Sequence, residues 1–265
     1  MNYILLIIKG FIIGSAKIIP GVSGAVIAIT LGVYEKIIKI ISHPFNVKNI
    51  KYITPLGLGI GLSIFLLSNV IKWFLLYYPL PTIFLFSGLI IGELPDITKE
   101  IKYNKTNIII FLITLLFSFY LMNIHDFNIN KNDSTYLLMG IIEALTTIIP
   151  GVSGTAIFMS LNLYTNLLEV FNEIVLMNIN YEIILFILGF IITIFISSKI
   201  INYLFEKHKS KAYSSILGLS IVSLITMIKS IHFNKNHIIT GILFFYFGYQ
   251  CIKKINNFFK NKTYH

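Results

Sequence analysis

The pentapeptide Pro20-Gly21-Val22-Ser23-Gly24 occurs a second time in the chain, as Pro150-Gly151-Val152-Ser153-Gly154. In both copies Ile-Ile precedes the proline, and an apolar run that contains a tyrosine follows the last glycine. Proline lacks a backbone donor and disfavours helix at the residue before it, while glycine accepts backbone angles that other residues avoid. Each copy therefore predicts a break in an apolar helix.

The composition indicates an integral membrane protein. Hydrophobic residues make up 56% of the 265 residues, charged residues make up 12%, and the mean hydropathy is +0.82. A soluble domain carries about 25% charged residues, and several apolar stretches here approach the length of about 20 residues that spans a bilayer. We expect no cleaved signal peptide, because the first residues lack a basic segment and Lys17 interrupts the first apolar run.

The net charge of +10 comes from lysine alone, since the chain has no arginine. Most lysines lie between the apolar stretches, where they orient a membrane protein and face anionic headgroups, so we do not expect nucleic acid as a partner. The single Cys251 excludes an internal disulfide. The six histidines are scattered without metal-ligand spacing, and we expect no metal and no cofactor.

The two motifs belong to a longer internal repeat. Gly10–Ile37 and Gly140–Leu167 align without gaps, and 12 of the 28 aligned positions are identical. The same order of apolar segments then continues at a constant offset of 130 in the numbering. We interpret this as a duplication within a single membrane domain of residues 1–265, with repeat one at 1–124 and repeat two at 135–254.

Each repeat predicts a helical hairpin broken at the motif, followed by three transmembrane helices. In the first repeat these apolar segments are Tyr3–Ile19, Val22–Ile41, Ile53–Tyr78, Thr82–Leu94 and Ile108–Ile124. The hairpin adds two membrane crossings if its arms span the membrane and none if it is re-entrant. Together with the three further helices, each half therefore has an odd number of crossings. The sequence therefore predicts an all-α membrane fold of two inverted repeats, each with a re-entrant hairpin, as in many transporters.

The lysines support that inversion and suggest an orientation. If the N-terminus is cytoplasmic, fifteen lysines fall inside: Lys36, Lys39, Lys48, Lys51, Lys99, Lys102, Lys105, Lys199, Lys207, Lys209, Lys211, Lys253, Lys254, Lys260 and Lys262. Only Lys72, Lys131, Lys229 and Lys235 then fall outside. Because cytoplasmic loops carry an excess of lysine, we expect a multi-pass protein of the cell membrane with both termini cytoplasmic.

The broken helices predict an anion site. A helix that restarts after the motif presents free N–H groups and the positive end of its dipole, which favours phosphate. Inversion would bring the two helix starts together from opposite sides of the membrane. The alternative is that the motifs are packing kinks only. The predicted substrate-binding residues are Pro20, Gly21, Val22, Ser23, Gly24, Pro150, Gly151, Val152, Ser153, Gly154, Thr155 and Lys17.

Charged residues within apolar runs are further candidates, because such residues are rare in membranes. Lys17 lies three residues before Pro20 and could neutralise a phosphate, pair with Glu143 or extend to the membrane interface. Glu143 precedes the second motif and is the candidate for proton coupling. Glu93, beside Pro95, is expected at the inner interface.

In these residues the chain resembles the bacterial polyprenyl-phosphate transporter family. The first repeat of that family has the core Asn-Ile-Ile-Pro-Gly-Val-Ser-Gly-Gly-Thr followed by Gly-x-Tyr-Glu, and the chain is similar to it at residues 17–26 and 32–35. Residues 149–155 resemble the second core, Ile-Pro-Gly-Ile-Ser-Gly-Ser. The chain departs from the family pattern at Lys17, where Asn is usual, at Ala25-Val26, where Gly-Thr is usual, and at Asn162, where Gly is usual.

The resemblance implies a non-enzymatic flippase that returns undecaprenyl phosphate from the outer to the inner leaflet for cell-wall synthesis. Its partners would be the polyprenyl-phosphate lipid and bilayer lipids, and self-association stays open. One alternative is a polyprenyl-diphosphate phosphatase, although the motifs lack the arginine and clustered acid-base pairs that such enzymes use. Another is a small-ion or solute transporter, because broken helices also serve ions.

Overall fold

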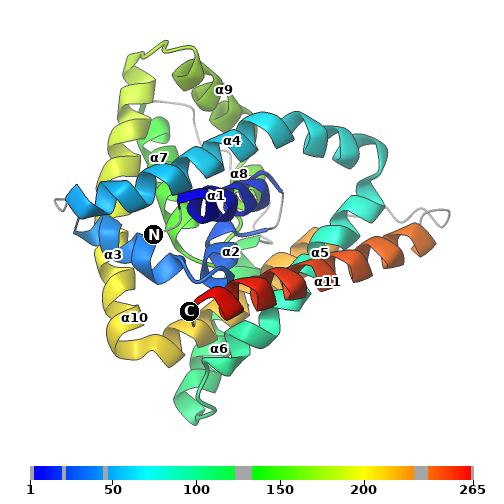
Figure 1. Ribbon diagram of the computed structural model, residues 1–265. Helices are drawn as coiled ribbons and strands as arrows, with labels where there is room; N and C mark the ends of the chain where they lie inside the picture. Colours follow the sequence, from blue (N-terminus) through cyan, green and yellow to red (C-terminus); the bar gives the residue numbers. More distant parts are fainter. Residues whose placement is uncertain (1–2, 20–21, 44–46, 123–132, 230–237, 264–265) are drawn as a thin grey trace.

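The computed structural model describes residues 3–19, 22–43, 47–122, 133–229 and 238–263, and within these ranges every regular element is an α-helix (Figure 1). Four stretches are long and apolar enough to cross a membrane: Asn49–Leu67, Pro79–Lys99, Tyr181–Lys229 and Ile238–Ile255. The chain is therefore a multi-pass membrane protein, as its composition predicts.

The described part of the first half contains six helices. They are α1 (Tyr3–Ile18), α2 (Gly24–Thr30), α3 (Tyr34–Ser42), α4 (Val47–Tyr77), α5 (Pro79–Lys99) and α6 (Lys105–Met122). The second half contains α7 (Asp133–Ile148), α8 (Gly154–Ser160), α9 (Tyr164–Val175), α10 (Tyr181–Lys229) and α11 (Ile238–Thr263). The ends of α7 and α8 repeat those of α1 and α2 at the same offset of 130 in the numbering.

The long helix α10 corresponds to α4 and α5 together. Its backbone kinks at His208, with φ −133° and ψ 37°. The equivalent position in the first half is Tyr78, which separates α4 from α5 with φ −133° and ψ 55°. Pro79 and Pro81 follow Tyr78, whereas Lys209 and Lys211 follow His208, so the bend does not depend on proline.

The second arm of each hairpin differs from its prediction. We expected one segment over Val22–Ile41, but α2 ends at Thr30 and α3 begins at Tyr34. Gly32 adopts φ +66° at this break, and its equivalent Asn162 adopts φ +56°. Asparagine tolerates this left-handed conformation better than other residues with a side chain. Asn162 therefore departs from the family pattern but keeps the backbone geometry that the glycine supplies.

The extent of α5 also corrects a prediction. We expected the helix Thr82–Leu94 to stop near Pro95, but α5 runs from Pro79 to Lys99 with Pro95 inside it. Proline fits the first turn of a helix, where no intrahelical donor is needed, which explains the early start. At Pro95 the helix loses one backbone hydrogen bond without ending.

The hairpins pack on the long helices by close backbone contact. A Cβ atom at Gly10 would overlap the carbonyl oxygen of Leu56, which packs α1 against α4. The same contact recurs in the second half, where a Cβ atom at Gly140 would overlap the carbonyl oxygen of Phe186 and α7 packs against α10. Small residues at such crossings are typical of membrane helices.

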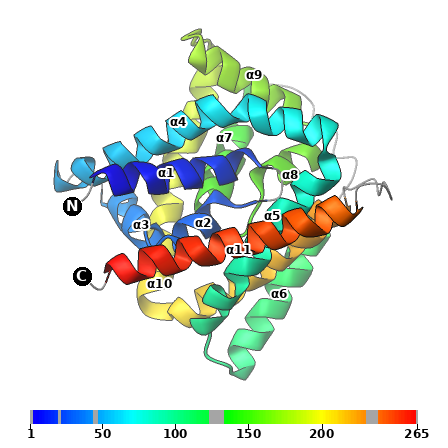
Figure 2. The same ribbon diagram turned by 45° about the vertical axis from the view of Figure 1, so that its right-hand side comes forward.

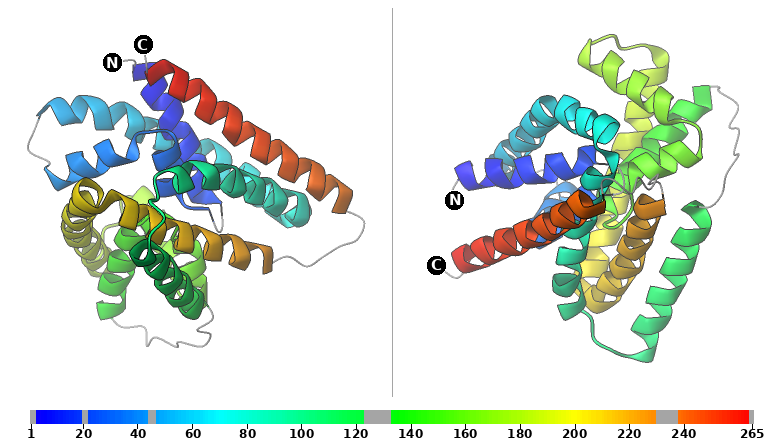
Figure 3. Two further views of the ribbon diagram at one scale, coloured as in Figure 1. Left: turned by 90° about the horizontal axis from the view of Figure 1, so that it is seen from below. Right: turned by 90° about the vertical axis from the view of Figure 1, so that its right-hand side faces the viewer.

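The last helix of each half packs against the other half. Figure 3 shows α11 beside α5, and α6 beside the second part of α10. A Cβ atom at Gly88 on α5 would overlap the carbonyl oxygen of Phe245 on α11, and one at Gly218 on α10 would lie 2.9 Å from the carbonyl oxygen of Phe111 on α6. The two halves are therefore interlocked and form one packed body.

Charged contacts gather at the end of the molecule that holds α3 and both chain termini (Figure 2). Lys209 Nζ, just after the kink of α10, lies 3.3 Å from Glu35 of α3 and 3.2 Å from Glu100 beyond α5. Lys39 Nζ of α3 lies 3.9 Å from Glu206 Oε1 of α10. These contacts tie α3 to α10 on that side.

Candidate substrate-binding site

The second motif forms a tight turn between α7 and α8. Gly151 adopts φ +86°, a conformation that favours glycine. A Cβ atom there would lie 2.8 Å from Cβ of Leu219 and 3.0 Å from the nitrogen of Ser220, both on α10. The backbone of the motif therefore lies directly against the second part of α10.

Hydroxyl groups line this turn. Ser223 of α10 donates a hydrogen bond of 2.6 Å to the carbonyl oxygen of Gly151. The hydroxyls of Ser153 and Thr155 lie 3.1 Å apart, and Ser153 is buried. Ser220 Oγ is buried and has no hydrogen-bond partner within the described residues. The turn thus combines a fixed backbone with several small polar groups.

The first motif is described from Val22 onward, and the predicted residues Pro20 and Gly21 lie outside the described residues. Ser23 is extended, with φ −95° and ψ 115°, and its side chain makes no capping hydrogen bond to α2. Ser23 Oγ is buried without a hydrogen-bond partner in the part of the chain that the structure describes. A buried hydroxyl without a partner costs free energy, so this group is suited to a bound ligand.

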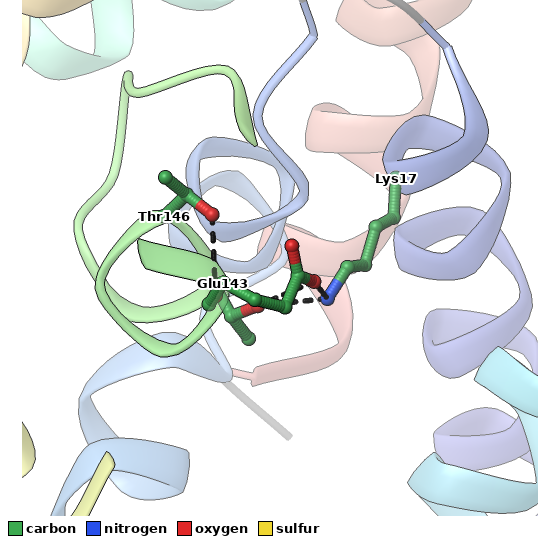
Figure 4. Close-up of polar contacts among 4 residues, drawn as sticks. Lys17, Glu143 and Thr146 are labelled. Atoms are coloured by element: carbon green, nitrogen blue, oxygen red, sulfur yellow. Dashed lines mark hydrogen bonds and ion pairs between the residues drawn. The ribbon is translucent and has the colours of Figure 1, made fainter. Parts of the chain in front are cut away.

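An ion pair joins α1 of the first half to α7 of the second (Figure 4). Lys17 Nζ lies 3.0 Å from Glu143 Oε1 and donates to Thr147 Oγ1 at 2.8 Å. The Thr147 hydroxyl in turn donates to Glu143 Oε1 at 3.3 Å. The Lys17 side chain is 41% exposed and that of Glu143 is 8% exposed, so the cation remains accessible while the carboxylate does not.

This ion pair lies between the two motifs. A Cβ atom at Gly24, the first residue of α2, would lie 3.6 Å from Lys17 Cβ. A Cβ atom at Gly154, the first residue of α8, would lie 3.5 Å from Glu143 Oε2 and 2.6 Å from the Thr146 hydroxyl. The starts of α2 and α8 therefore flank the two partners of one ion pair.

A second contact crosses between the halves. The buried Tyr34 hydroxyl, at the start of α3, donates a hydrogen bond of 2.6 Å to the carbonyl oxygen of Ile148 at the end of α7. This carbonyl belongs to the last turn of a helix that breaks at Pro150, where carbonyls lack intrahelical donors. Tyr34 thus satisfies a backbone group that the second motif leaves open.

The structure brings several of the predicted site residues to this junction. Ser23, Gly24 and Lys17 come from the first half, and Ser153, Gly154 and Glu143 come from the second. Pro150 and Gly151 are buried, Val152 and Thr155 are half-buried, and Val22 packs into the apolar core. Sequence analysis did not identify Tyr34, Thr147 and Ser223 as polar partners. Tyr34 aligns with Tyr164 and Thr147 aligns with Lys17, and these alignments could have marked both residues as candidates for the site.

The chemistry of the junction suits an anion. It offers an accessible ammonium group and a buried hydroxyl without a partner among the described residues. Because α2 and α8 have seven residues each, their dipoles are small, and Lys17 and the hydroxyls carry more of the interaction than the sequence suggests. Within the described residues no cluster of His, Cys, Asp and Glu could hold a metal ion.

Two bacterial proteins of related sequence share one name. The protein called polyprenyl-phosphate transporter in Staphylococcus aureus (strain NCTC 8325 / PS 47) is 29% identical over 262 residues, which cover 92% of this chain and 92% of the relative. A protein of the same name in Vibrio cholerae serotype O1 (strain ATCC 39315 / El Tor Inaba N16961) is 28% identical over 185 residues, 63% of this chain and 60% of the relative. No solved structure matches the chain.

A sequence family accounts for most of the chain. Residues 13–241 match the family described as VCA0040-like, undecaprenyl phosphate translocase-like. The matched range includes Lys17, both serines of the motifs and the whole of α10. This chain therefore belongs to the VCA0040-like family of undecaprenyl phosphate translocase-like proteins.

Proposed function

We propose that this protein transports undecaprenyl phosphate across the bacterial cytoplasmic membrane and holds the phosphate between the two motifs. The observation that carries the proposal is the Lys17–Glu143 pair, because it places an accessible cation between the starts of α2 and α8. A phosphate that enters would compete with Glu143 for Lys17 and would give the Ser23 hydroxyl a partner. The isoprenoid tail would stay in lipid.

The inverted-repeat arrangement is part of the proposal. Lys17 and Thr147 are equivalent positions of the two halves, and they hydrogen-bond to each other. When two units are related by a two-fold axis, residues that touch their own equivalents lie on that axis. This contact supports a two-fold axis through the junction, and such an axis in the membrane plane gives halves of opposite orientation.

The length of α2 and α8 supports re-entrant hairpins. Seven residues rise about 10 Å in an α-helix, which is far less than the hydrocarbon core of about 30 Å. Broken backbone at that depth must face protein or a wet cavity. The turn of the second motif meets this condition, because Gly151 packs against α10. Gly24 and Gly154, which end the two motifs, lie beside the Lys17–Glu143 pair.

A difference between the hairpins supports alternating access. In the first half α3 packs on α10, and Tyr34 bonds to Ile148. Tyr164 makes no such bond to Ile18 among the described residues, and α9 has no comparable packing on α4 or α5. We infer that one hairpin is docked and the other is not, and that the reverse arrangement exposes the phosphate to the other leaflet.

The proposed orientation puts both termini, α3 and the charged contacts of Lys209 in the cytoplasm. Substrate would then be collected on the outer side, where α9 is less firmly packed, and released on the α3 side. We retain Glu143 as a coupling candidate, because phosphate binding to Lys17 would remove the cation that compensates its charge.

The test is transport of undecaprenyl phosphate by purified protein in proteoliposomes, measured as loss of outer-leaflet phosphate. We expect wild-type protein to move the lipid and Lys17→Met to be strongly impaired. Lys99→Met is the matched control, since Lys99 pairs with Asp96 at the surface. Release of inorganic phosphate from undecaprenyl diphosphate, or absence of transport by wild-type protein, would contradict the proposal.

A further inference from the structure

Glu93 is a buried carboxyl group that the junction of the motifs does not use. We expected it at the inner membrane interface, and the structure buries it against protein, with 1% of the residue exposed. Its Oε1 atom has no hydrogen-bond partner within the described ranges of the chain. An unpaired charge buried in an apolar interior is very costly, and carboxyl groups at such sites in membrane proteins are functional candidates.

The internal repeat indicates what Glu93 faces. Its equivalent in the second half is Ser223, whose hydroxyl donates to the carbonyl oxygen of Gly151 in the second motif. Glu93 lies on α5, which packs against α2 of the first motif, and the neighbouring Ile90 shares an apolar core with Val22. The position that contacts the second motif through a hydroxyl thus corresponds to a carboxyl group on the helix that packs against α2.

From this placement we propose that Glu93 binds a proton together with the phosphate at the first motif. This inference rests on the proposed function. The neutral carboxyl group can donate a hydrogen bond towards the motif or the phosphate, as Ser223 donates towards Gly151. The ionised group would repel a phosphate and has no cation paired with it among the described residues. Proton binding and phosphate binding at this site therefore favour each other.

The described surroundings of Glu93 contain no compensating cation. Gly92, the adjacent residue, lies against Ile252 and the Tyr249 backbone of α11. The elements that pack on α5 carry further titratable residues, with none on α2. They include Asp96 and Lys99 on α5 itself, Tyr246, Tyr249, Cys251, Lys253 and Lys254 on α11, Glu206, His208, Lys209, Lys211 and Tyr213 on α10, and Tyr52 and Tyr77 on α4. In the described part of the chain, none of these forms an ion pair with Glu93: Asp96 pairs with Lys99, Lys253 stacks over Tyr249, and Lys209 pairs with Glu35 and Glu100.

Glu93 thus differs from Glu143, the other buried carboxyl group of the described residues. Glu143 has a lysine 3.0 Å away and a threonine hydroxyl as a further donor. An unpaired buried carboxyl group avoids its charge by holding a proton, whereas Glu143 has a lysine as its partner. The two carboxyl groups therefore have different parts in the cycle, with Glu143 responding to Lys17 and Glu93 to protons.

The test measures the affinity for undecaprenyl phosphate over a range of pH in wild-type protein, Glu93→Gln, Glu93→Ser and Asp96→Asn. The lipid phosphate itself titrates, with a second pKa of about 6, and contributes equally to all four profiles. We expect the affinity of wild-type protein and Asp96→Asn to fall more steeply with rising pH than that of both Glu93 variants. The additional steepness corresponds to the binding of one proton, which changes the affinity by up to about tenfold per pH unit.

The outcomes separate this inference from the proposed function. If wild-type protein binds the lipid and its affinity changes with pH in parallel with that of Glu93→Gln or Glu93→Ser, the inference about Glu93 is wrong and the proposed function still stands. Glu93→Ser introduces the residue of the second half, so it remains informative if Glu93→Gln does not fold. Absence of binding by wild-type protein at every pH would overturn the proposed function and this inference together.

Discussion

The two halves of the molecule share a backbone plan and differ in where they carry charge. Three backbone features recur at an offset of 130 in the numbering: the helix ends, the break at residues 32 and 162, and the bend at residues 78 and 208. The charged residues within these apolar helices do not recur: Lys17 corresponds to Thr147, Ile13 to Glu143, and Glu93 to Ser223. The two halves thus share their backbone geometry around the junction, whereas the charged residues there differ between them.

That difference matters for a transporter of an anion. A symmetric pair of lysines or carboxylates at the junction would repel each other, whereas one lysine facing one glutamate can form a pair that breaks when phosphate arrives. Buried ion pairs contribute little net stability, because desolvation offsets their attraction. Under the proposed function, the Lys17–Glu143 pair serves to exchange partners with phosphate and not to stabilise the fold.

The largest expected effect concerns the shared geometry. Gly10→Ala and Gly140→Ala each force a Cβ atom against a backbone carbonyl of the adjacent helix, and overpacking of this kind costs about 1–3 kcal/mol. We expect both variants to lower the thermal unfolding midpoint in detergent by similar amounts. Gly57→Ala on α4 is the control, since a Cβ atom there meets nothing within 4 Å. Equal stability of Gly140→Ala and Gly57→Ala would refute the contact.

The next effect concerns the charge asymmetry. Lys17→Met leaves the buried Glu143 without its cation, and loss of a hydrogen bond to a charged group costs about 1.5–3 kcal/mol. The double variant Lys17→Met with Glu143→Gln should recover that stability without recovering phosphate binding. Unfolding in detergent measures the first quantity and lipid binding the second. Recovery of both would show that Lys17 has no direct part in phosphate binding.

A smaller effect concerns the docking of α3. Lys209→Met removes contacts to Glu35 and Glu100, and such exposed pairs contribute about 0.2–1 kcal/mol each. We expect faster hydrogen exchange of the α3 amides with no change in α9. Unaltered exchange in α3 would mean that the packing of α3 on α10, and not the ion pairs, holds the hairpin.

The smallest effect tests the equivalence of the turns. Gly32 and Asn162 share a left-handed conformation, so the exchange variants Gly32→Asn and Asn162→Gly should each change the free energy of unfolding by less than about 0.5 kcal/mol. Gly32→Val should cost about 1–2 kcal/mol, because a β-branched residue fits this conformation poorly. A Gly32→Asn variant as unstable as Gly32→Val would break the proposed equivalence.

Sequence alone predicted the helical membrane fold and the positions of the breaks at the motifs. Proline and glycine act on the local backbone, so their effect is readable without tertiary contacts. Pro95 and Gly32 were misjudged, because packing around α5 carries the helix through a proline and a single glycine ends α2 early. Val22–Ile41 was therefore one predicted segment where the structure has two helices.

Polar contacts between the halves were harder to foresee. Pairing of Lys17 with Glu143 was one of several alternatives, since only the fold decides which side chains meet across so long a stretch of sequence. The burial of Glu93 was not expected either, because a carboxyl group beside a proline near lysines is typical of a helix end. The hydrogen bond from Ser223 to Gly151 depends on the docking of α10, which no local pattern encodes.

The central claim is tested most directly by measuring the affinity for undecaprenyl phosphate in wild-type protein, Ser23→Ala and Ser153→Ala. Undecaprenol, which lacks the phosphate, is the control ligand. Loss of a serine hydroxyl that contacts the charged phosphate should weaken binding by about tenfold or more. Undecaprenol should bind weakly, and its affinity should not differ among the three proteins. Wild-type affinity for the phosphate lipid in both variants would contradict a phosphate site formed by the two motifs.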